Sequence, residues 1–527
     1  MRNMGPEIHP AQQDWDVIIV GGALTGAAVA IQLLKQNPHL KLAIIESSPA
    51  HKRRVGESTV EVSSYFLGRV LGLSSELNRN HISKQGLRFW FSNDSVSHFS
   101  ECSELGPRFN VLFPGYQIDR ASLDETVLSK AVSLGATLLR PVKALDVTLH
   151  EGQTQSVECS SPTERYTLKG RWVIDASGVR ALIARKYGWI TRNTKHPTAT
   201  VWSRWKGVTD WDDETLLKEA PAWGQAVVGV RNNATNHLVG KGWWSWWIPL
   251  QNGDVSIGLV YDQRLFELPP GKHLGDRLAT HLRSHPMGAR LLKNATYIQG
   301  DVSLRSHLAY SSNHFAGDGF ALIGDAAGFL DPFYSPGLDW VAYGVMATAK
   351  LISDALEKKY ACPHAIATHN QQFKLSYSRW FNALYKDKYY YIGDYELMTL
   401  ALRLDLGAYY LGAVSRPYHL GPNSLTIPSF AQPEARWPAA IMAFYNRRLA
   451  AIGRKRMTDG RWGQKNANHQ FYLFSYRLNA SLPLRLLGAL TAYLRLELKE
   501  LFHPQPHILV SPEQTPDPQV DKPSSPP

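Results

Sequence analysis

Cysteine is scarce in this 527-residue chain, and the three that it has, Cys102, Cys159 and Cys362, lie far apart. They are too few and too scattered for a disulfide framework or a four-cysteine zinc site. The 19 histidines form no HExxH motif, and no paired CxxC accompanies them. We therefore expect a cytoplasmic protein in a reducing compartment, without a metal site.

Long apolar runs are also missing. No uninterrupted run approaches the roughly 18 residues that cross a bilayer, and Met1 to Gln13 lacks the apolar stretch of a signal peptide. Acidic residues are outnumbered, with 45 Asp and Glu against 57 Lys and Arg. Because the basic residues are dispersed and no recognition module is present, we do not expect a nucleic-acid partner.

A glycine-rich turn near the N-terminus predicts a dinucleotide site. The β-branched run 16–20 leads into the turn, and residues 27–34 follow with helical spacing. A second apolar run ends at Glu46, where a Rossmann unit places the carboxylate that binds a ribose. Alanine stands at the middle glycine position, so looser binding of a pyrophosphate is expected. The residues of the turn are Gly21, Gly22, Ala23 and Gly26.

Two later segments, 172–178 and 319–328, are strand-like runs that end in small residues and an Asp. With the glycine turn, they resemble the FAD-dependent monooxygenase and halogenase superfamily. The resemblance implies an FAD site in which Asp325 contacts the ribityl chain. It also implies that the flavin is held by Asp175, Gly178 and Arg120.

Two motifs resemble the flavin-dependent halogenases, in the branch similar to tryptophan halogenases. Trp244-Ser-Trp-Trp-Ile-Pro249 matches their WxWxIP signature, and Gly56-Glu-Ser-Thr59 precedes Lys84 as it precedes their catalytic lysine. The resemblance implies that reduced FAD and oxygen form a flavin hydroperoxide, which oxidises chloride or bromide. Lys84 would then orient hypohalous acid toward an aromatic substrate, while Trp244 and Trp246 wall the passage. On composition alone, both rings could simply fill a core.

The segment Asp331 to Gly337 weakens the halogenase interpretation. In the halogenases it resembles, a Ser-x-Gly loop offers backbone N–H groups to the halide, which here would involve Ser335 and Gly337. Pro336 between them has no N–H, and Tyr334 stands where tryptophan halogenases have an acid. Halogenation is favoured, and two alternatives stay open: hydroxylation of an aromatic or carrier-bound substrate, and reduction of a lipid or isoprenoid.

The partners of such an enzyme follow from the same motifs. No second glycine-rich strand–turn–helix unit is present, so reduced FAD would come from a partner reductase or from transiently docked NAD(P)H. The substrate would be a small aromatic molecule, either free or bound to a carrier protein. The amphipathic run 482–501 and nearby basic clusters suggest an acidic carrier, or peripheral contact with the inner face of the membrane.

The predicted architecture is α/β, with a Rossmann-type FAD-binding domain interleaved with a mainly antiparallel substrate sheet and followed by an α-helical extension. Eight of the 16 Trp lie between Trp202 and Trp247, where strands are expected at 224–230 and 255–261. The expected boundaries are 14–60, 116–187 and 301–355 for the FAD-binding domain, 61–115 for a cap segment, 188–300 for the substrate sheet, 356–510 for the helical domain and 511–527 for a disordered Pro-rich tail.

Overall fold

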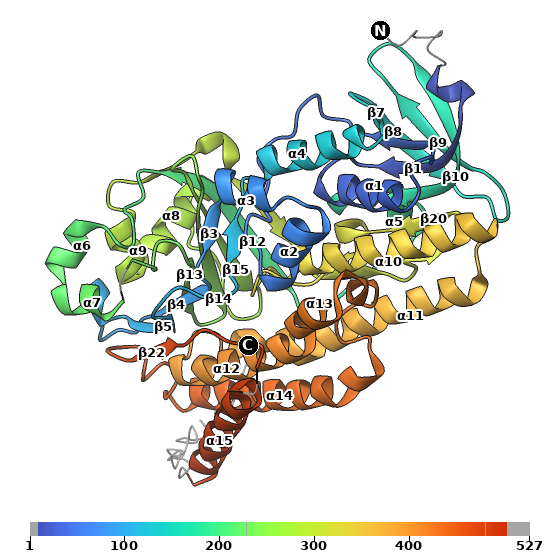
Figure 1. The fold of residues 1–527 in the computed structure, drawn as a ribbon. Helices are drawn as coiled ribbons and strands as arrows, with labels where there is room; N and C mark the ends of the chain where they lie inside the picture. Colours follow the sequence, from blue (N-terminus) through green and yellow to red (C-terminus); the bar gives the residue numbers. More distant parts are fainter. Residues whose placement is uncertain (1–8, 228, 480, 503–527) are drawn as a thin grey trace, which may run out of the picture.

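The computed structural model describes residues 9–227, 229–479 and 481–502. Figure 1 shows a parallel sheet with its helices at one end, a second sheet at the other, and a layer of C-terminal helices below both. The predicted α/β class is confirmed. The tail 511–527, expected to be disordered, lies outside the described residues.

The parallel sheet has the order β20-β10-β1-β2-β7. Its central strand is buried on both faces: Val17 and Ile19 pack against one group of helices, while Ile18 and Val20 face the opposite side. Helix α1 lies between α4 and α10 on the first side. The strands are β1 (Asp14–Val20), β2 (Leu42–Ile45), β7 (Thr137–Leu139), β10 (Arg165–Asp175) and β20 (Phe320–Leu322), and the helices are α1 (Leu24–Gln36), α4 (Arg120–Ser133) and α10 (Gly337–Lys358).

Antiparallel strands extend this sheet beyond its parallel core. β9 pairs with β10, β8 pairs with β9, and β19 pairs with β20. The three are β8 (Lys143–Thr148), β9 (Gln155–Ser160) and β19 (Ala316–Gly317), and α5 (Leu182–Lys186) follows β10 along the chain.

The second sheet has the order β16-β12-β15-β14-β13-β4-β5-β22, with β17 also paired to β12. It is mainly antiparallel, as predicted, and only the pairs β13–β4 and β22–β5 are parallel. Its strands are β4 (Leu87–Phe91), β5 (Ser103–Pro107), β12 (Thr198–Lys206), β13 (Thr235–Gly240), β14 (Trp243–Pro249), β15 (Val255–Asp262), β16 (Thr296–Tyr297), β17 (Ser303–Ser306) and β22 (Gln470–Leu473).

One of the two expected strands is confirmed and the other is wrong. Residues 255–261 do form β15, but 224–226 belong to the short helix α7 (Pro221–Ala226), and 227, 229 and 230 are not in a strand; residue 228 lies outside the described residues. Pro221 occupies the first turn of α7, where its fixed φ favours a helix, and Trp223 is buried against Trp90. Three more helices lie beside this sheet: α6 (Glu214–Glu219), α8 (Leu274–Ser284) and α9 (Pro286–Leu291).

Small elements connect the two sheets. β3 pairs with β6, and β11, β18 and β21 form a three-stranded sheet. They are β3 (Ile82–Lys84), β6 (Gly115–Gln117), β11 (Ile190–Arg192), β18 (Tyr310–Ser312) and β21 (Gly328–Phe329), with the helices α2 (Glu61–Tyr65) and α3 (Ser74–Asn80) nearby.

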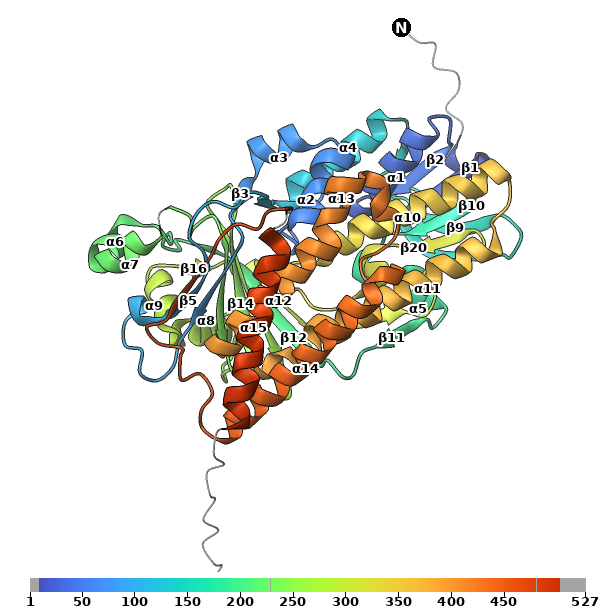
Figure 2. The same ribbon diagram turned by 60° about the horizontal axis from the view of Figure 1, so that its bottom comes forward.

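The C-terminal part is helical, as predicted, and Figure 2 shows its helices spread across one side of the molecule. One element was not predicted: β22 leaves this layer and joins the edge of the substrate sheet beside β5. The shared core contains strand residues such as Phe91 and Trp244 and helix residues such as Leu397 and Leu449. The helices are α11 (Pro363–Trp380), α12 (Tyr395–Tyr409), α13 (Ser415–Leu420), α14 (Arg436–Thr458) and α15 (Ser481–Leu501).

One stretch of this layer, Tyr395–Leu420, is long and apolar enough to cross a membrane by length and composition. Its most apolar window has a mean hydropathy of 1.2, and 67% of that window is buried inside the protein. Burial of this extent is what a core helix also shows.

Candidate active site

The glycine turn after β1 has a backbone that side chains would obstruct. Gly21 has φ +106°, and a Cβ there would lie 2.5 Å from the carbonyl oxygen of Ala176. A Cβ on Gly26 would lie 1.9 Å from the carbonyl oxygen of Gly21, so α1 could not approach the turn as closely. Both glycines are therefore required by the geometry that brings a pyrophosphate against the start of α1.

The acid at the end of β2 is close to this turn. Gly22 N donates to Glu46 Oε2 at 2.9 Å, and Ser48 N donates to the other oxygen at 2.7 Å. The N-cap of α1 is Ala23, which provides no side-chain acceptor for the first turn, so the amides there remain for a bound phosphate. Ala23 has φ −70°, a conformation that alanine adopts without strain. These features fit the dinucleotide part of FAD.

Asp325 also suits FAD. It lies in a short turn before β21, and within the described residues its carboxylate accepts no hydrogen bond. Burial raises its pKa, while the charges of Arg305 and Arg120 oppose this effect. Asp325 is half-buried, and its carboxylate oxygens can accept hydrogen bonds from the hydroxyls of a ribityl chain. The guanidinium of Arg120 is anchored by Asp124, with Nε donating to Oδ1 at 2.9 Å.

The other two residues expected near the flavin, Asp175 and Gly178, shape the turn after β10. The carboxylate of Asp175 accepts hydrogen bonds from Ser177 N at 3.0 Å and Ile183 N at 2.8 Å. Both of its oxygens are thus used to hold the turn after β10, which makes it a support of that turn. Gly178 has φ +63° in the same turn, with no atom within 4 Å of where a Cβ would stand.

Lys84 lies in a second region, a cavity of about 110 Å³ between the β3–β6 ribbon and the C-terminal helices. The side chain is buried, and its Nζ donates to Ser58 Oγ and to Thr59 O, both at 2.8 Å. Gly115 pairs with Lys84 across the ribbon, and a Cβ there would lie 2.6 Å from Thr59 O. The lysine is therefore held in a fixed position at the cavity wall.

The charge of Lys84 is balanced by two carboxyl groups. Burial lowers the pKa of Lys84 to about 8, and the nearby Glu61 and Asp339 oppose this shift. Both acids line the same cavity. At neutral pH most of the lysine is protonated and able to donate hydrogen bonds to a small ligand.

The loop before α10 brings Ser335 to Lys84. Ser335 Oγ donates to Ser58 Oγ at 3.4 Å, so both groups share Ser58. Tyr334 and Ser335 have φ values of +71° and +59°, a left-handed conformation that is costly for such residues and is typical of functional loops. Pro336, the N-cap of α10, follows them.

This loop separates two cavities. Pro336 and Trp380 line the Lys84 cavity and also a smaller one of about 40 Å³. The smaller cavity is lined by Asp325 and Gly337, two residues expected to contact FAD. The cavity on the expected flavin side and the Lys84 cavity are therefore adjacent and share two wall residues.

The two Trp of the WxWxIP motif are placed differently from the prediction. Trp244 and Trp246 are 1% and 8% exposed, and neither lines the Lys84 cavity or the smaller one. Trp244 Nε1 donates to Tyr389 OH at 2.9 Å, and Tyr389 OH donates to Asp331 Oδ2 at 2.9 Å. Both rings lie in a core between β14 and the C-terminal helices, and Trp244 contacts the active-site loop directly at Phe333, with ring centroids 5.1 Å apart, as well as through Tyr389.

One acid of the Lys84 cavity was not predicted from the sequence. Asp339, in the first turn of α10, accepts hydrogen bonds from Ser63 N and Tyr409 OH, both at 2.8 Å. Burial raises its pKa to about 7, although these two donors oppose the shift. Tyr334 occupies the position where an acid was expected, and Asp339 brings one into the cavity from the following helical turn.

Asp405 of α12 was also missed, because its role depends on distant residues. Its carboxylate accepts hydrogen bonds from Tyr334 OH at 2.9 Å, Lys388 Nζ at 2.9 Å and Tyr445 OH at 2.6 Å. All three donors come from separate segments, so no sequence spacing connects them. Asp405 thereby fixes the strained loop residue Tyr334 to the helical layer.

Comparison with known proteins agrees with this arrangement. The family model described as tryptophan halogenase matches residues 96–387, more than half of the chain. A flavin-dependent halogenase of Dictyostelium discoideum, chlA, is 26% identical over 446 residues, covering 77% of this chain and 72% of that protein. A 1H-pyrrole-2-carbonyl-[peptidyl-carrier protein] chlorinase of Pseudomonas fluorescens is 23% identical over 417 residues, covering 75% and 85%.

Solved structures share the fold. Halogenase PltM superposes with a TM-score of 0.73 at 17% identity, covering 92% of this chain and 99% of that chain. Its complex with phloroglucinol and FAD has a TM-score of 0.72 at 17% identity, with 92% and 98% covered. The family match favours halogenation over the hydroxylase and lipid-reductase alternatives. This chain belongs to the tryptophan halogenase family, and it is an FAD-dependent halogenase.

Proposed function

We propose that this enzyme halogenates a free phenol-like aromatic molecule bound in the Lys84 cavity. The observation that carries the proposal is that a buried ammonium, Lys84, and the carboxyl of Asp339 line the same cavity. Most other side chains around them are aromatic or aliphatic, including Trp380, Leu384 and Tyr410. Such a site suits a flat apolar ring that carries hydroxyl groups.

Each residue then has a defined task. Bound reduced FAD and oxygen would supply the oxidising equivalents that convert a halide ion into hypohalous acid. Lys84 Nζ donates a hydrogen bond to the oxygen of hypohalous acid and orients its halogen toward the ring. A new carbon–halogen bond forms, the oxygen–halogen bond breaks, and the ring proton leaves with the hydroxide as water.

Asp339 would assist by accepting the proton of the substrate hydroxyl. The phenolate formed in this way is more electron-rich and attacks the halogen faster. A carboxyl with a pKa near 7 is well matched to this transfer at neutral pH. Ser335 and Gly337 on the intervening loop are proposed to guide the halide between the two cavities.

Two similar proteins have different aromatic ligands or substrates, and these are the two kinds of substrate to choose between. The PltM complex contains phloroglucinol, a free phenol, whereas the Pseudomonas fluorescens chlorinase acts on a pyrrole attached to a carrier protein. We favour the free phenol because the cavity offers carboxylates beside an apolar ring site. A carrier-bound substrate is the alternative that the turnover experiment distinguishes.

We further propose that reduced FAD is delivered by a separate flavin reductase. The support is that the sequence holds a single glycine-rich strand–turn–helix unit, which the FAD itself would occupy. With NADH and FAD alone, the purified enzyme should leave the flavin oxidised. Addition of a flavin reductase should start turnover.

The experiment that tests the activity is aerobic turnover with reduced FAD, bromide or chloride, and phloroglucinol, followed by mass analysis of the product. We expect the mass of the halogenated ring only when halide is present. A second arm offers a pyrrole or phenol thioester on a carrier protein. Halogenation of that substrate alone would overturn the free-phenol proposal, and a hydroxylated product in both arms would contradict halide use by this site.

A further inference from the structure

The outer face of α15 carries a stripe of exposed leucines. Leu484, Leu487, Leu494 and Leu498 are 69%, 60%, 60% and 55% exposed, and Leu501 is 71% exposed. Their spacings of three, four and seven place them on one side of a helix. The opposite side, with Leu482, Ala489, Tyr493 and Leu496, is buried against the protein.

Helix α14 exposes large apolar side chains as well. Trp437, Ile441 and Phe444 are 72%, 53% and 50% exposed and are also spaced by four and three residues. Figure 2 shows α14 and α15 on the same side of the molecule, and Tyr445 of α14 packs near Tyr493 of α15. We refer to the exposed residues of these two helices as the outer face.

The charges of these helices are one-sided. α14 contains no Asp or Glu, and α15 contains only Glu497 and Glu500 as acids. The basic residues of the two helices are Arg436, Arg447, Arg448, Arg454, Lys455, Arg456, Arg485, Arg495 and Lys499.

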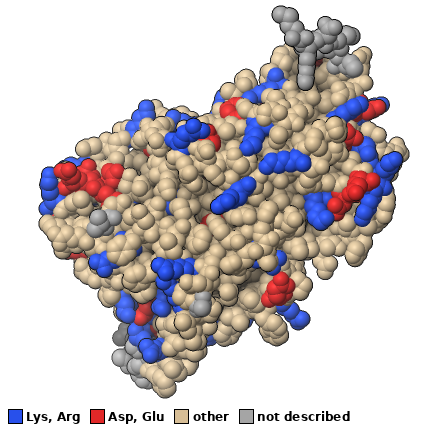
Figure 3. All heavy atoms as spheres, viewed as in Figure 1, with Lys and Arg blue, Asp and Glu red and all other residues tan. Residues whose placement is uncertain are grey.

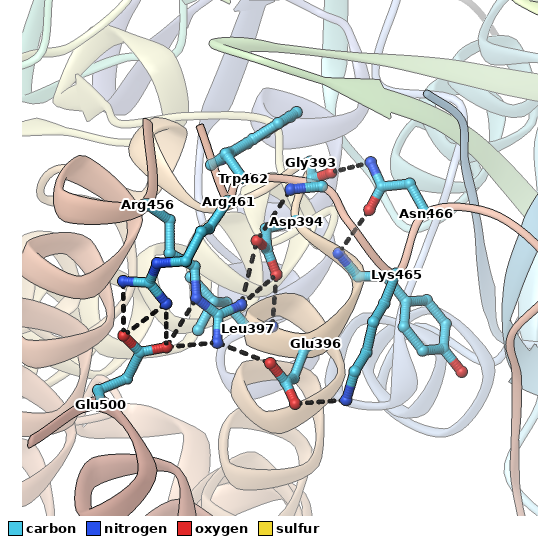
Figure 4. Close-up of polar contacts among 12 residues, drawn as sticks. Gly393, Asp394, Glu396, Leu397, Arg456, Arg461, Trp462, Lys465, Asn466 and Glu500 are labelled. Carbon is cyan, nitrogen blue, oxygen red and sulfur yellow. Dashed lines mark hydrogen bonds and ion pairs between the residues drawn. The ribbon is translucent and has the colours of Figure 1, made fainter. Parts of the chain in front are cut away.

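Both acids of α15 are held in ion pairs, and Glu500 is buried. Glu500 accepts hydrogen bonds from Arg456 Nη2 at 2.7 Å and Arg461 Nη2 at 3.1 Å, and Figure 4 shows these contacts beside Asp394 and Glu396. Glu497 pairs with Arg448 at 2.7 Å. These bonds anchor α15, so its leucine stripe is held outward while its negative charge is neutralised.

Positive charge remains on the outer side. Arg447 and Arg495 are exposed, and within the described ranges neither forms an ion pair. Figure 3 shows several Lys and Arg side chains, with an acidic one among them, toward the lower end of the molecule, where α15 lies in Figure 1. The outer face therefore combines exposed leucines and aromatics with uncompensated cations.

We propose that the outer face of α14 and α15 docks the enzyme onto an anionic phospholipid bilayer. Leucine and tryptophan side chains enter the boundary between headgroups and acyl chains, while arginines attract the lipid phosphates. A second copy of the chain is a poorer occupant, since its own positive charge would face this one. The expected location is the cytoplasmic side of the membrane, as a peripheral protein.

The outer face adjoins the mouth of the Lys84 cavity. Arg485 Nη1, in the first turns of α15, donates to Phe474 O at 2.9 Å and to Ser475 O at 3.0 Å. Phe474 lines the cavity and is 62% exposed, so it lies where the cavity opens. A docked enzyme would hold this opening close to the lipid surface.

Sedimentation with vesicles tests the docking. The full chain is mixed with vesicles of phosphatidylcholine alone, or with one third phosphatidylglycerol. We expect binding to the anionic vesicles that is at least tenfold tighter. Leu494→Ser/Leu498→Ser and, separately, Arg447→Glu/Arg495→Glu should each weaken it at least tenfold. The matched control is Leu304→Ser on β17, which removes a leucine that is 51% exposed outside the outer face.

FAD affinity and halogenation of a water-soluble phenol should be unchanged in all of these variants, which separates docking from folding and from the proposed function. Failure of the parent chain to sediment with anionic vesicles would overturn the proposal. So would equal losses in the Leu304 control, or a concentration-dependent dimer that the leucine variants abolish. Membrane docking would also be contradicted if the chain bound an acidic carrier protein and the leucine substitutions left that binding unchanged.

Discussion

Ser58 Oγ accepts a hydrogen bond from Lys84 Nζ at 2.8 Å, and the same oxygen accepts one from Ser335 Oγ at 3.4 Å. Ser58 thus connects the proposed catalytic lysine with the loop proposed to guide the halide. Its hydroxyl also lies 3.1 Å from Thr235 Oγ1, which fixes it from β13. A change at the hydroxyl of Ser58, Ser335 or Thr235 should therefore affect Lys84.

Replacement of the ammonium should stop halogen transfer. In Lys84→Met, a side chain of similar length has no hydrogen-bond donor, so we expect product formation to fall by about 10²–10⁴-fold, as for other positioned groups of this kind. Oxygen consumption by reduced FAD should continue, because the FAD residues are untouched. Product analysis beside oxygen uptake checks this, and a variant that keeps full halogenation would remove Lys84 from the mechanism.

Ser58 is predicted to be a positioning residue. Ser58→Ala removes one of the two acceptors of the ammonium, which should lower the pKa of Lys84 further. Turnover should fall about tenfold, equivalent to roughly 1.4 kcal/mol. The rate should also begin to decline at a lower pH than in the parent enzyme. Ser58→Thr restores the hydroxyl, and if it fails to restore the pH profile, the proposed role is wrong.

The pH dependence should be bell-shaped. Asp339 must be ionised to accept a proton, so activity should fall as the pH drops below about 7. Lys84 must be protonated, so activity should fall as the pH rises above about 8. In Asp339→Asn the acidic limb should disappear, and the alkaline limb should move lower because a carboxylate that raises the pKa of Lys84 is lost. Profiles of kcat/KM on a phenol test this, and an acidic limb that persists in the variant would exclude Asp339.

Trp244 should support the active-site loop, through its contact with Phe333 and through Tyr389. Trp244→Phe removes the hydrogen bond to Tyr389, and we expect a loss of unfolding free energy of about 1–3 kcal/mol for the buried partner left without a donor. Trp246→Phe is the comparison, because its Nε1 makes the longer hydrogen bond, to Ser256 Oγ at 3.3 Å. Chemical denaturation and KM for bromide should both change more for Trp244 than for Trp246. Equal effects in the two variants would mean that Trp244 contributes only ordinary packing.

Gly26→Ala should weaken FAD binding. The added methyl would stand 1.9 Å from Gly21 O, so α1 must shift away from the phosphate turn. We expect at least a tenfold rise in the Kd for FAD, measured by flavin fluorescence, since each tenfold corresponds to about 1.4 kcal/mol. Gly412→Ala is the control, because no atom lies within 4 Å of its added Cβ. Unchanged FAD affinity in Gly26→Ala would contradict the proposed site.

The parts of the site that are local along the chain could be predicted from the amino-acid sequence. Strand, glycine turn and helix follow one another between β1 and α1, so the run from Gly21 to Glu46 predicted a dinucleotide site from periodicity and spacing alone. The short motif around Gly56–Thr59 likewise led to Lys84. The WxWxIP motif pointed to the family, although its strand was buried by helices far along the chain.

Contacts between distant segments needed the tertiary structure. Asp339 is linked to Tyr409 and Asp405 to Tyr334, each across about 70 residues of sequence. Such pairs leave no periodic or spacing signal, because folding brings together side chains whose separation along the chain is arbitrary. The sequence therefore predicted the family and the candidate lysine, whereas packing of the C-terminal helices decided which acids share its cavity and that Trp244 and Trp246 lie in a core instead of along the cavity wall.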